Sequence, residues 1–518
     1  MARRLLVADR VAGAAEGANA ILVDGAHVTA VGRHHDLVGA AGEVVSYDGA
    51  TLMAGLRDAH LHPVPYTALL GGANLKTARS LAEVADRLRG AAARSPGPVV
   101  AMRLDDEALA DRRLPTREDL DAAVADRPVL VHRVCGHIAV ANSAALALAG
   151  IDTATPDPEG GIIDRGEAGV PTGVLRETAI EIASRALAGT AQVAEDDVLA
   201  ALGGLTSLGL TSIGAMVRTG DGPWASLGDE VELLASIAGR VPLRIHGFTI
   251  ADDEAELSYG RRLLTGAGPL VRWAGLKRFA DGGLGGHTAA MSEPFADEPT
   301  NRGTLRLGGH DEDLARACLA AGGAVAIHAI GDLACSRVID LFERVGAPQG
   351  RVRLEHASVI TREDVARMAR LGVVACVQPS FLGSESGWLE ARVGPDRMAL
   401  TYPFASMQAA GVVLAGGSDC PVETPDPWSG MALARDRAGL VPEERLDAAS
   451  ALDLFTAGAA RALGEQPPLR PGSPADVIAV DRDPLTSTPD ELRATRVEAV
   501  WIAGNELEID RSAITWPE

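Results

Sequence analysis

The chain has 518 residues, of which 47% are apolar and 23% are charged, and its formal net charge is −22. This is the composition of a soluble globular protein that could hold one large barrel with attachments or two to three ordinary domains. The negative charge argues against nucleic acid or an anionic membrane as the main partner, since both attract basic surfaces. No apolar run reaches the roughly 18 residues that a transmembrane helix needs.

The cysteines and the start of the chain bear on its location. Five cysteines, at positions 135, 318, 335, 376 and 420, are scattered and form no CxxC pair. They are typical of reduced thiols in a cytoplasmic protein. The opening MARRLLVADR lacks the long apolar stretch of a signal peptide. We expect a small-molecule substrate, and a homodimer is a reasonable expectation for a chain this large and acidic.

Both ends of the chain carry short β patterns. Residues 1–54 include ANAILVDGAHVTAVG, two β-rich runs around Asp24-Gly25, which is a hairpin signal. Residues 468–518 include ADVIAVDRDP and VEAVWIAGNELEI, with a turn near Gly504-Asn505. We predict that the two ends pair into one small β-sandwich.

Residues 55–467 show a different pattern. Short apolar runs alternate with helical stretches such as DEDLARACLAAG and TREDVARMARLG, as in βα units. Eight such units predict an α/β fold, a (β/α)8 TIM barrel with an insertion. The candidate strands cover residues 51–60, 211–216, 242–249, 274–281, 324–329, 352–357, 373–380 and 412–419.

The gap between the first two candidate strands is too long for one helix. It predicts an inserted subdomain over about residues 66–205. Within this insert, RPVLVHRVCGHIAVANSAALALAGI reads as a strand, a turn and a helix.

The sequence DAHLH ends the first candidate strand of the barrel. Its His-x-His spacing puts His60 and His62 on the same side of a strand. Imidazole suits zinc, iron, nickel and similar metals. The alternative is two solvent-facing histidines, as we expect for His34-His35 in a polar turn.

Three more polar residues sit at the C-terminal tips of candidate strands. His328 ends AVAIH, His356 ends RVRLEH, and Asp419 ends VVLAGGSD. Taken alone, each histidine is best interpreted as a buried residue that forms hydrogen bonds with the backbone. In a barrel these tips meet at one mouth, so together with His-x-His they predict a catalytic metal site with an open position.

Lysine is rare in this chain, which has only Lys76 and Lys277 among its 48 lysines and arginines. A lysine buried among cations loses its proton easily. Its neutral amine can add carbon dioxide, and the resulting carbamate is an anionic ligand able to bridge two metals; arginine cannot do this. The alternative is a salt bridge from Lys277 to a neighbour such as Asp281.

Several motifs together carry a resemblance that covers essentially the whole chain: DAHLH, GLKRFADGGLGGHTAAM, AIHAIGD, LEHASVI and GSDCPVETPDPW, with GHIAVANSAALALAGI, PTGVLRE and SPADVIAVDRDP in support. The set resembles the amidohydrolase superfamily, and more narrowly the large-insert branch that includes N-substituted formamide deformylase. The resemblance implies a distorted (β/α)8 barrel, a β-sandwich from both termini, and one or two divalent metals, most often zinc.

Roles follow from the resemblance by position. His60 and His62 would bind the more buried metal, and His328 and His356 the outer metal. Lys277 as a carbamate would bridge, and Asp419 would bind the inner metal and shuttle protons.

Two departures from the branch pattern bear on the substrate. His287 stands where arginine is usual, and Ala405 follows Tyr402-Pro403-Phe404 where arginine is often found. The loss of two guanidiniums argues against an anionic substrate and weakens the formamide assignment.

The hypothesis is metal-assisted hydrolysis of an amide-type bond, non-peptide and of N-formyl or N-acyl type. Asp419 accepts a proton from water and returns it to the leaving nitrogen. The alternatives are a deaminase, lyase or isomerase on the same scaffold and, remotely, a non-catalytic regulatory protein.

Four further residues are candidates for substrate binding. His137 and His287 would orient the substrate or stabilise an oxyanion. The alternative for His137 is a structural contact inside the insert, and the alternative for His287 is a solvated loop residue. Gln378 and Tyr402 would line the pocket. We expect Arg176-Glu177 to be a structural ion pair at the barrel mouth, and the loops at 380–388 and 420–428 to shape the pocket.

Overall fold

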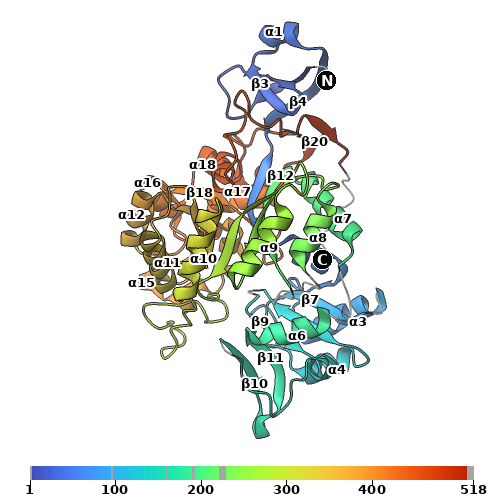
Figure 1. The fold of residues 1–518 in the computed structure, drawn as a ribbon, viewed down its shortest axis with the longest axis vertical. Helices are drawn as coiled ribbons and strands as arrows, with labels where there is room; N and C mark the ends of the chain where they lie inside the picture. Colours follow the sequence, from blue (N-terminus) through green and yellow to red (C-terminus); the bar gives the residue numbers. More distant parts are fainter. Residues whose placement is uncertain are drawn as a thin grey trace.

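The computed structural model describes residues 3–94, 97–134, 136–158, 160–188, 193–220 and 229–509. Three parts follow one another along its long axis: a sheet built from both ends of the chain, a central barrel, and the insert (Figure 1). Within these residues, the helices are all too short or too polar to cross a bilayer.

Eight parallel strands form the central sheet, in the order β18-β17-β16-β15-β14-β13-β12-β5. Most residues of these strands are buried, as expected for strands covered on both faces, and β14 is the exception with four buried residues of nine. All eight fall on the predicted segments, and the predicted fold class, an α/β barrel with an insertion and a terminal β unit, is confirmed. The strands are β5 Leu56–Leu61, β12 Leu210–Arg218, β13 Arg244–Ile250, β14 Val271–Phe279, β15 Ala324–Ala329, β16 Val352–His356, β17 Val374–Val377 and β18 Val413–Gly416.

The first and last strands meet to close the barrel. Leu61 and Cys420 form a parallel bridge. The His62 amide donates to the Cys420 carbonyl at 2.8 Å, and the Asp419 amide donates to the His60 carbonyl, also at 2.8 Å. This seam sets the His-x-His segment beside Asp419, although the two are far apart in the sequence.

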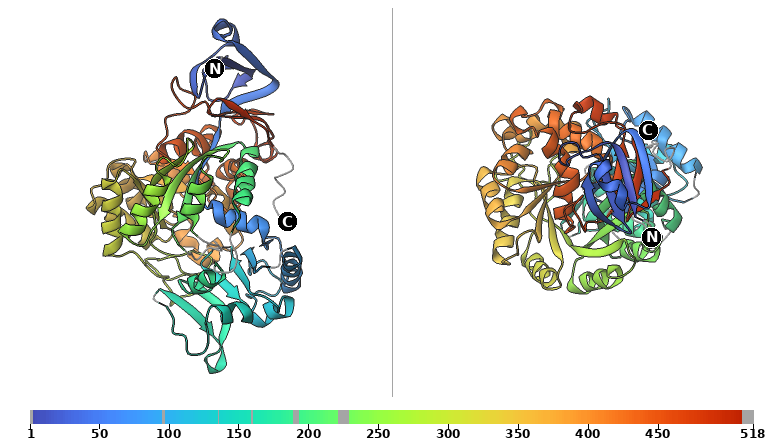
Figure 2. Two further views of the ribbon diagram at one scale, coloured as in Figure 1. Left: turned by 45° about the vertical axis from the view of Figure 1, so that its right-hand side comes forward. Right: turned by 90° about the horizontal axis from the view of Figure 1, so that it is seen from above.

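Helices surround the barrel strands, as the view from above shows (Figure 2). Both stretches predicted to be helical are α10 and α12; Thr361 caps α12 by accepting from the Asp364 amide at 3.1 Å. The helices of this part are α2 Pro63–Gly71, α7 Glu195–Ser207, α8 Glu230–Ile237, α9 Glu254–Leu264, α10 Gly309–Ala320, α11 Asp332–Arg344, α12 Arg362–Leu371, α13 Pro379–Glu385, α14 Leu389–Val393, α15 Pro395–Met398, α16 Phe404–Ala409, α17 Pro427–Asp436, α18 Ala448–Asp453 and α19 Ala459–Ala462.

The segment 51–60, predicted as one strand, is divided at Gly55. Residues up to Ala54 belong to β4 of the terminal sheet, and β5 starts at Leu56. Gly55 packs directly on Thr211, because a Cβ at this position would lie 2.3 Å from the Thr211 Oγ1. The prediction of a single strand was wrong here, since an apolar run does not reveal where the chain passes from one sheet to the next.

The insert has its own six-stranded sheet, in the order β10-β11-β9-β8-β7-β6. The segment predicted as strand, turn and helix contains an additional strand, β9, between the turn and α5; Cys135 in that turn lies outside the described residues. The elements are β6 Ala73–Asn74, α3 Leu81–Arg94, β7 Val99–Leu104, α4 Arg117–Ala123, β8 Val129–Arg133, β9 Ile138–Ala141, α5 Ser143–Leu148, β10 Gly161–Arg165, β11 Pro171–Glu177 and α6 Ala179–Ala188.

The two ends of the chain share one seven-stranded sheet, in the order β21-β20-β19-β4-β1-β2-β3. The hairpins β2–β3 and β20–β21 are antiparallel and form at the two predicted turns. The predicted domain limits 1–54, 55–467 and 468–518 stay predictions. The elements are β1 Arg4–Val11, β2 Ala20–Asp24, β3 His27–Gly32, α1 His34–Leu37, β4 Glu43–Ala54, β19 Val477–Val480, α20 Pro489–Arg493, β20 Val497–Ile502 and β21 Asn505–Leu507.

Candidate metal centre and active site

The residues predicted as metal ligands converge at the mouth of the barrel. One ligand atom from each of His60, His356 and Asp419 lies within 4.8 Å of the others. The Asp419 Oδ1 is 3.3 Å from the His60 Nε2 and 3.2 Å from the His62 Nε2. Asp419 and His356 adopt positive φ angles of 56° and 73°, a region that non-glycine residues seldom occupy outside functional sites.

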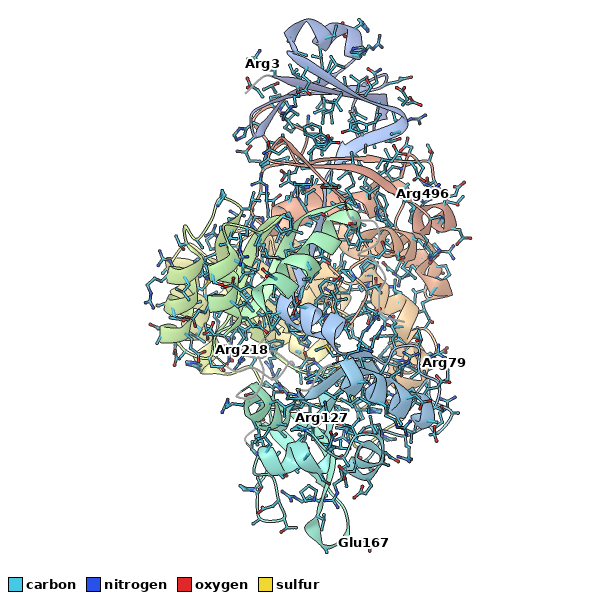
Figure 3. All side chains as sticks on the ribbon, turned by 90° about the vertical axis from the view of Figure 1, so that its right-hand side faces the viewer. Arg3, Arg79, Arg127, Glu167, Arg218 and Arg496 are labelled. Carbon is cyan, nitrogen blue, oxygen red and sulfur yellow. The ribbon has the colours of Figure 1, made fainter. Side chains whose placement is uncertain are left out.

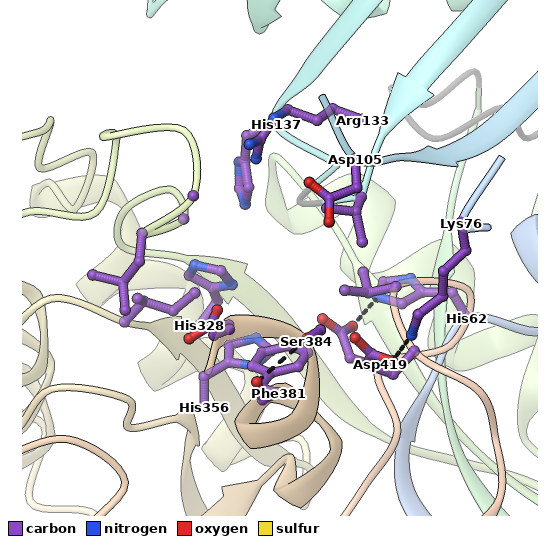
Figure 4. Close-up of a pocket in the computed structure, with 18 of the residues that line it drawn as sticks. His62, Lys76, Asp105, Arg133, His137, His328, His356, Phe381, Ser384 and Asp419 are labelled. Carbon is purple, nitrogen blue, oxygen red and sulfur yellow. Dashed lines mark hydrogen bonds and ion pairs between the residues drawn. The ribbon is translucent and has the colours of Figure 1, made fainter. Parts of the chain in front are cut away.

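His328 completes the group on the other side of His356. The two rings have centroids 4.5 Å apart, and His356 lies 5.0 Å from His60. The His328 Nε2 donates to the Gly282 carbonyl at 3.1 Å, with Asp281 close by. Four buried imidazoles and one carboxylate therefore lie close together, and Figure 4 shows His62, His328, His356 and Asp419 of this group.

Hydrogen-bond partners behind two histidines orient their rings. The His60 Nδ1 donates to the Glu355 Oε2 at 2.6 Å, and Glu355 is held in turn by the Arg353 Nε at 2.8 Å. The His356 Nδ1 donates to the Gln378 Oε1 at 2.8 Å. Because each Nδ1 is a donor, the Nε2 of each ring keeps its lone pair, as a metal ligand requires.

Burial sets the charge of these groups. It lowers the pKa of His62, His328 and His356, and for the last two the value falls well below the ordinary range. Burial opposes ionisation of Asp419, but the neighbouring His60 and His62 hold the pKa of that carboxyl well below its usual range. Neutral imidazoles and an ionised carboxylate form a donor set that fits a divalent cation.

Lys277 lies beneath the histidines and is 0% exposed. Its Nζ is 3.4 Å from the His60 Nε2 and 4.8 Å from the centroid of the Phe279 ring. Burial lowers its pKa to about 8. Asp281, the alternative partner, instead accepts hydrogen bonds from the amides of Ala290, Ile330 and Gly331 at 2.8–3.0 Å.

A cavity opens above the ligands. The insert covers it with Lys76, Asp105, Arg133 and His137; in Figure 4 Lys76, Asp105 and His137 point toward the barrel residues, and Arg133 lies across the roof. The segment that begins with α13 forms another wall, with Phe381, Ser384, Glu385 and Trp388. Val422 and Glu423 come from the loop after β18. Both loops expected to shape the pocket thus contribute to it.

Of the four predicted substrate-binding residues, His137 lines this cavity, with its ring centroid 5.6 Å from that of His328. Among the described residues, the lining does not include His287, Gln378 or Tyr402. Gln378 stands behind His356, the Tyr402 hydroxyl donates to the Glu385 Oε2 at 2.5 Å, and the His287 Nε2 lies 3.1 Å from Asp297.

The predicted ion pair between Arg176 and Glu177 does not form. Arg176 pairs with Asp164 at 2.9 Å, whereas Glu177 contacts Arg306 and the His137 Nδ1. The two residues are consecutive in β11, so their side chains leave opposite faces of the strand and cannot meet. The ion pair of Glu177 with Arg306, which follows β14, ties the insert to the barrel, and the contact of Glu177 with His137 lies within the insert.

Lys76 and Glu385 line the cavity and were not among the predicted site residues. Lys76 is the chain's other lysine, so the rarity that drew notice to Lys277 applied to it equally. Glu385 lies on α13, and burial raises its pKa to about 8. No sequence pattern distinguished it from an exposed glutamate.

Solved structures similar to this chain define its class. A metal-dependent hydrolase from Pyrococcus furiosus superposes with a TM-score of 0.74 at 28% identity, covering 93% of this chain and 100% of that chain. One from Pyrococcus horikoshii gives a TM-score of 0.76 at 27% identity, covering 94% and 99%. The fold is that of a metal-dependent barrel hydrolase.

The sequence comparisons are more specific. Residues 43–507 match the model of the Amidohydrolase family. The protein YtcJ of Bacillus subtilis is 31% identical over 483 residues, covering 89% of this chain and 90% of that protein. N-substituted formamide deformylase of Arthrobacter pascens is 29% identical over 531 residues, covering 94% of each chain. The chain belongs to the amidohydrolase family, and the predicted class, a hydrolase acting on carbon–nitrogen bonds, is confirmed with it.

Proposed function

We propose that this amidohydrolase cleaves a non-peptide amide, of N-formyl or N-acyl type, in the cavity at the barrel mouth. The observation that carries the proposal is the convergence of His60, His356 and Asp419 within 4.8 Å beneath a cavity with apolar walls. The similarity to N-substituted formamide deformylase supports an N-formyl substrate.

One or two divalent ions, most often zinc in the resembling enzymes, would be held by these residues. His60, His62 and Asp419 would take the more buried ion, and His328 and His356 the outer one. A bound ion supplies a Lewis acid that polarises the substrate carbonyl and lowers the pKa of water. The buried, neutral imidazoles and the ionised Asp419 support this assignment.

Lys277 would bind as a carbamate. The ammonium first loses one proton to solvent; its neutral Nζ then attacks carbon dioxide, a C–N bond forms, and a second proton leaves to solvent, so that the side chain becomes an anion. A pKa lowered to about 8 supports this step, because a useful fraction of the amine is neutral at physiological pH. The contact with the His60 Nε2 would put the carbamate oxygens among the imidazoles.

Asp419 is the proton carrier in this proposal. It is ionised and adjoins both His60 and His62 at the cavity floor. It accepts a proton from the attacking water and returns it to the leaving nitrogen.

His137 would orient the substrate rather than stabilise an oxyanion. Its Nδ1 faces Glu177 at 3.0 Å and therefore donates to that carboxylate. Burial lowers its pKa to about 4, so the ring is neutral at pH 7 and its Nε2 carries a lone pair. This lone pair can accept a hydrogen bond from the N–H of a substrate amide, whereas it would repel a negatively charged oxyanion.

Deamination, elimination and isomerisation on the same scaffold are the competing reactions, and a regulatory role without catalysis is a more remote one. The test is a panel of N-formyl, N-acyl and cyclic amides assayed with metal-analysed protein in ¹⁸O-labelled water. We expect amide turnover with one solvent oxygen in the carboxylate product. Turnover without label would favour a lyase or isomerase, and labelled products from amines alone would favour a deaminase.

The cysteines bear on where the protein is located in the cell. The described cysteines, Cys318, Cys335, Cys376 and Cys420, are buried free thiols, which supports a cytoplasmic protein. A homodimer stays our expectation, with light scattering as its test.

A further inference from the structure

Both lysines of the chain line the same cavity. The chain uses arginine for all but two of its 48 basic residues of these types, yet Lys76 and Lys277 both face the space above the predicted ligands. Lys277 lies next to His60, 3.4 Å from its Nε2, whereas Lys76 comes from the insert, just after β6 (Figure 4). The proposed chemistry uses Lys277 and leaves Lys76 without a role.

Lys76 is held from behind by an acidic residue. Its Nζ forms an ion pair with Glu423, whose side chain is 3% exposed, while that of Lys76 is 33% exposed. Arg103, itself 1% exposed, approaches Glu423 from the other side at 3.7 Å. Two cations thus share one carboxylate, and the ammonium, which has three N–H donors, turns its open side to the cavity.

Arg133 brings a second cation to the roof of the cavity. Its Nε donates to the Asp106 Oδ1 at 2.5 Å, and in Figure 4 it lies next to His137, with Asp105 between it and Lys76. Each of these cations has carboxylate partners, Glu423 for Lys76 and Asp106 and Glu107 for Arg133, and two further carboxyls line the cavity. Burial raises the pKa of Asp105, and it raises that of Glu385 to about 8, which favours their neutral forms.

We infer that Lys76, assisted by Arg133, binds a carboxylate of the substrate, so that the preferred substrates are N-formyl or N-acyl compounds with a free carboxylate. This inference rests on the proposed function. A compact ammonium suits a carboxylate that arrives in a confined space, where a guanidinium needs a planar approach. The apolar side chains of Phe381, Trp388 and Val422 would hold the part of the substrate between its amide and its carboxylate.

A substrate with a carboxylate is the opposite of what the sequence led us to expect. His287 and Ala405 replace guanidiniums of the family pattern, which argued against an anionic substrate. The insert supplies cations from a different place, Lys76 and Arg133, so the charge needed for an anion is present at the cavity roof.

The test compares substrates that differ in one group. N-formylphenylalanine and its carboxamide are assayed with the metal-loaded wild type, Lys76→Met, Lys76→Arg and Arg79→Met. Arg79 is the matched control, an exposed cation three positions away at the outer side of the insert (Figure 3). The metal content and melting temperature of each variant are measured alongside.

We expect the wild type to prefer the carboxylate in kcat/KM by roughly 10- to 100-fold, the scale of a hydrogen bond between charged groups. Lys76→Met should lose most of this ratio, Lys76→Arg should keep part of it, and Arg79→Met should keep all of it. A wild type that turns over both compounds without preference, or a Lys76→Met variant that keeps the preference, overturns the inference and leaves the proposed function intact.

Binding separates the two proposals if no amide is turned over. The affinities of phenylacetate and phenylacetamide are then measured by calorimetry on the same proteins. Tighter binding of phenylacetate that Lys76→Met abolishes would uphold the carboxylate site while the hydrolase proposal fails. Equal affinities, or a preference that survives in Lys76→Met, would reject the carboxylate site as well.

Discussion

Lys277 shows how one side chain can depend on its surroundings for its chemistry. It is completely buried, it touches the His60 ring, and burial lowers its pKa to about 8. An arginine at the same position would stay charged and could not be converted to a ligand.

Lys277→Arg should therefore lose bound metal and reduce turnover by about 100-fold or more. This loss exceeds the roughly 10- to 100-fold loss that follows when a hydrogen-bond partner of a metal ligand is removed. Its melting temperature should fall only modestly, because the larger side chain costs about 1–3 kcal/mol of packing. Metal analysis, turnover and carbon-13 NMR after incubation with labelled bicarbonate measure these outcomes.

Arg278→Lys is the matched control for this substitution. Arg278 is the next residue of β14 and points away from the site, toward Asp252 and Asp311. The control should keep its metal and its carbamate signal. If Lys277→Arg kept both metal and turnover, the carbamate assignment would be wrong.

Site residues at the ends of strands could be predicted from the sequence, whereas the positions of residues on loops could not. His60, His328, His356 and Asp419 could be selected because each ends an apolar run, and parallel strands all end at one mouth. Gln378 and Tyr402 were predicted to line the pocket, yet both lie behind other side chains. Their positions depend on the path of the loops around β17 and α16, which spacing does not encode.

At the scale of elements, the passage from the terminal sheet to the barrel depends on a single small residue. A Cβ on Gly55 would lie 2.3 Å from the Oγ1, 2.4 Å from the Cγ2 and 2.8 Å from the Cβ of Thr211. Thr211 is β-branched and stiff, so it cannot turn all three atoms away.

Gly55→Ala should lower the free energy of unfolding by about 1–3 kcal/mol, the usual cost of overpacking. Gly203→Ala in α7 is the control, because no atom lies within 4 Å of the Cβ it would add. That change should raise stability by about 0.5–1 kcal/mol through helix propensity. Thermal melting measures both, and equal melting temperatures for Gly55→Ala and the wild type would contradict the packing argument.

The strands themselves were predictable because strands buried on both faces appear as continuous apolar runs. The division at Gly55 and the extra strand β9 were missed for the same reason, since a short apolar run has no mark for its sheet or its partner.

At the scale of the whole molecule, stability should vary with pH through Glu385. Burial raises the pKa of this carboxyl from 4.5 to about 8. The folded chain therefore holds the proton more tightly than the unfolded chain. The stabilisation is complete below about pH 4.5 and is lost as the pH rises toward 8.

Glu385→Gln imitates the protonated form at every pH. Relative to the wild type, it should gain about 1–3 kcal/mol of unfolding free energy between pH 4.5 and pH 8. Denaturant unfolding across this range measures the difference. Glu390→Gln, an exposed change in the neighbouring α14, should give a flat difference. A flat difference for Glu385→Gln as well would mean that this carboxyl titrates normally.

The pairing of the two chain ends was predictable from their matching β patterns, and the existence of the insert from a gap too long for one helix. The position of the insert above the barrel mouth was not predictable, because it depends on tertiary contacts such as that between Glu177 of the insert and Arg306 of the barrel. That position brings Lys76 into the cavity.

The seam between β5 and the segment after β18 also sets the order of events during synthesis. His60 and His62 leave the ribosome early, but Asp419 and the carbonyl of Cys420 that anchor them emerge only after most of the chain has been translated. A nascent chain, or a fragment that ends before residue 419, can make the histidines and cannot build their site. A metal held by His60, His62 and Asp419 would therefore bind only after residue 419 has been made and folded against β5.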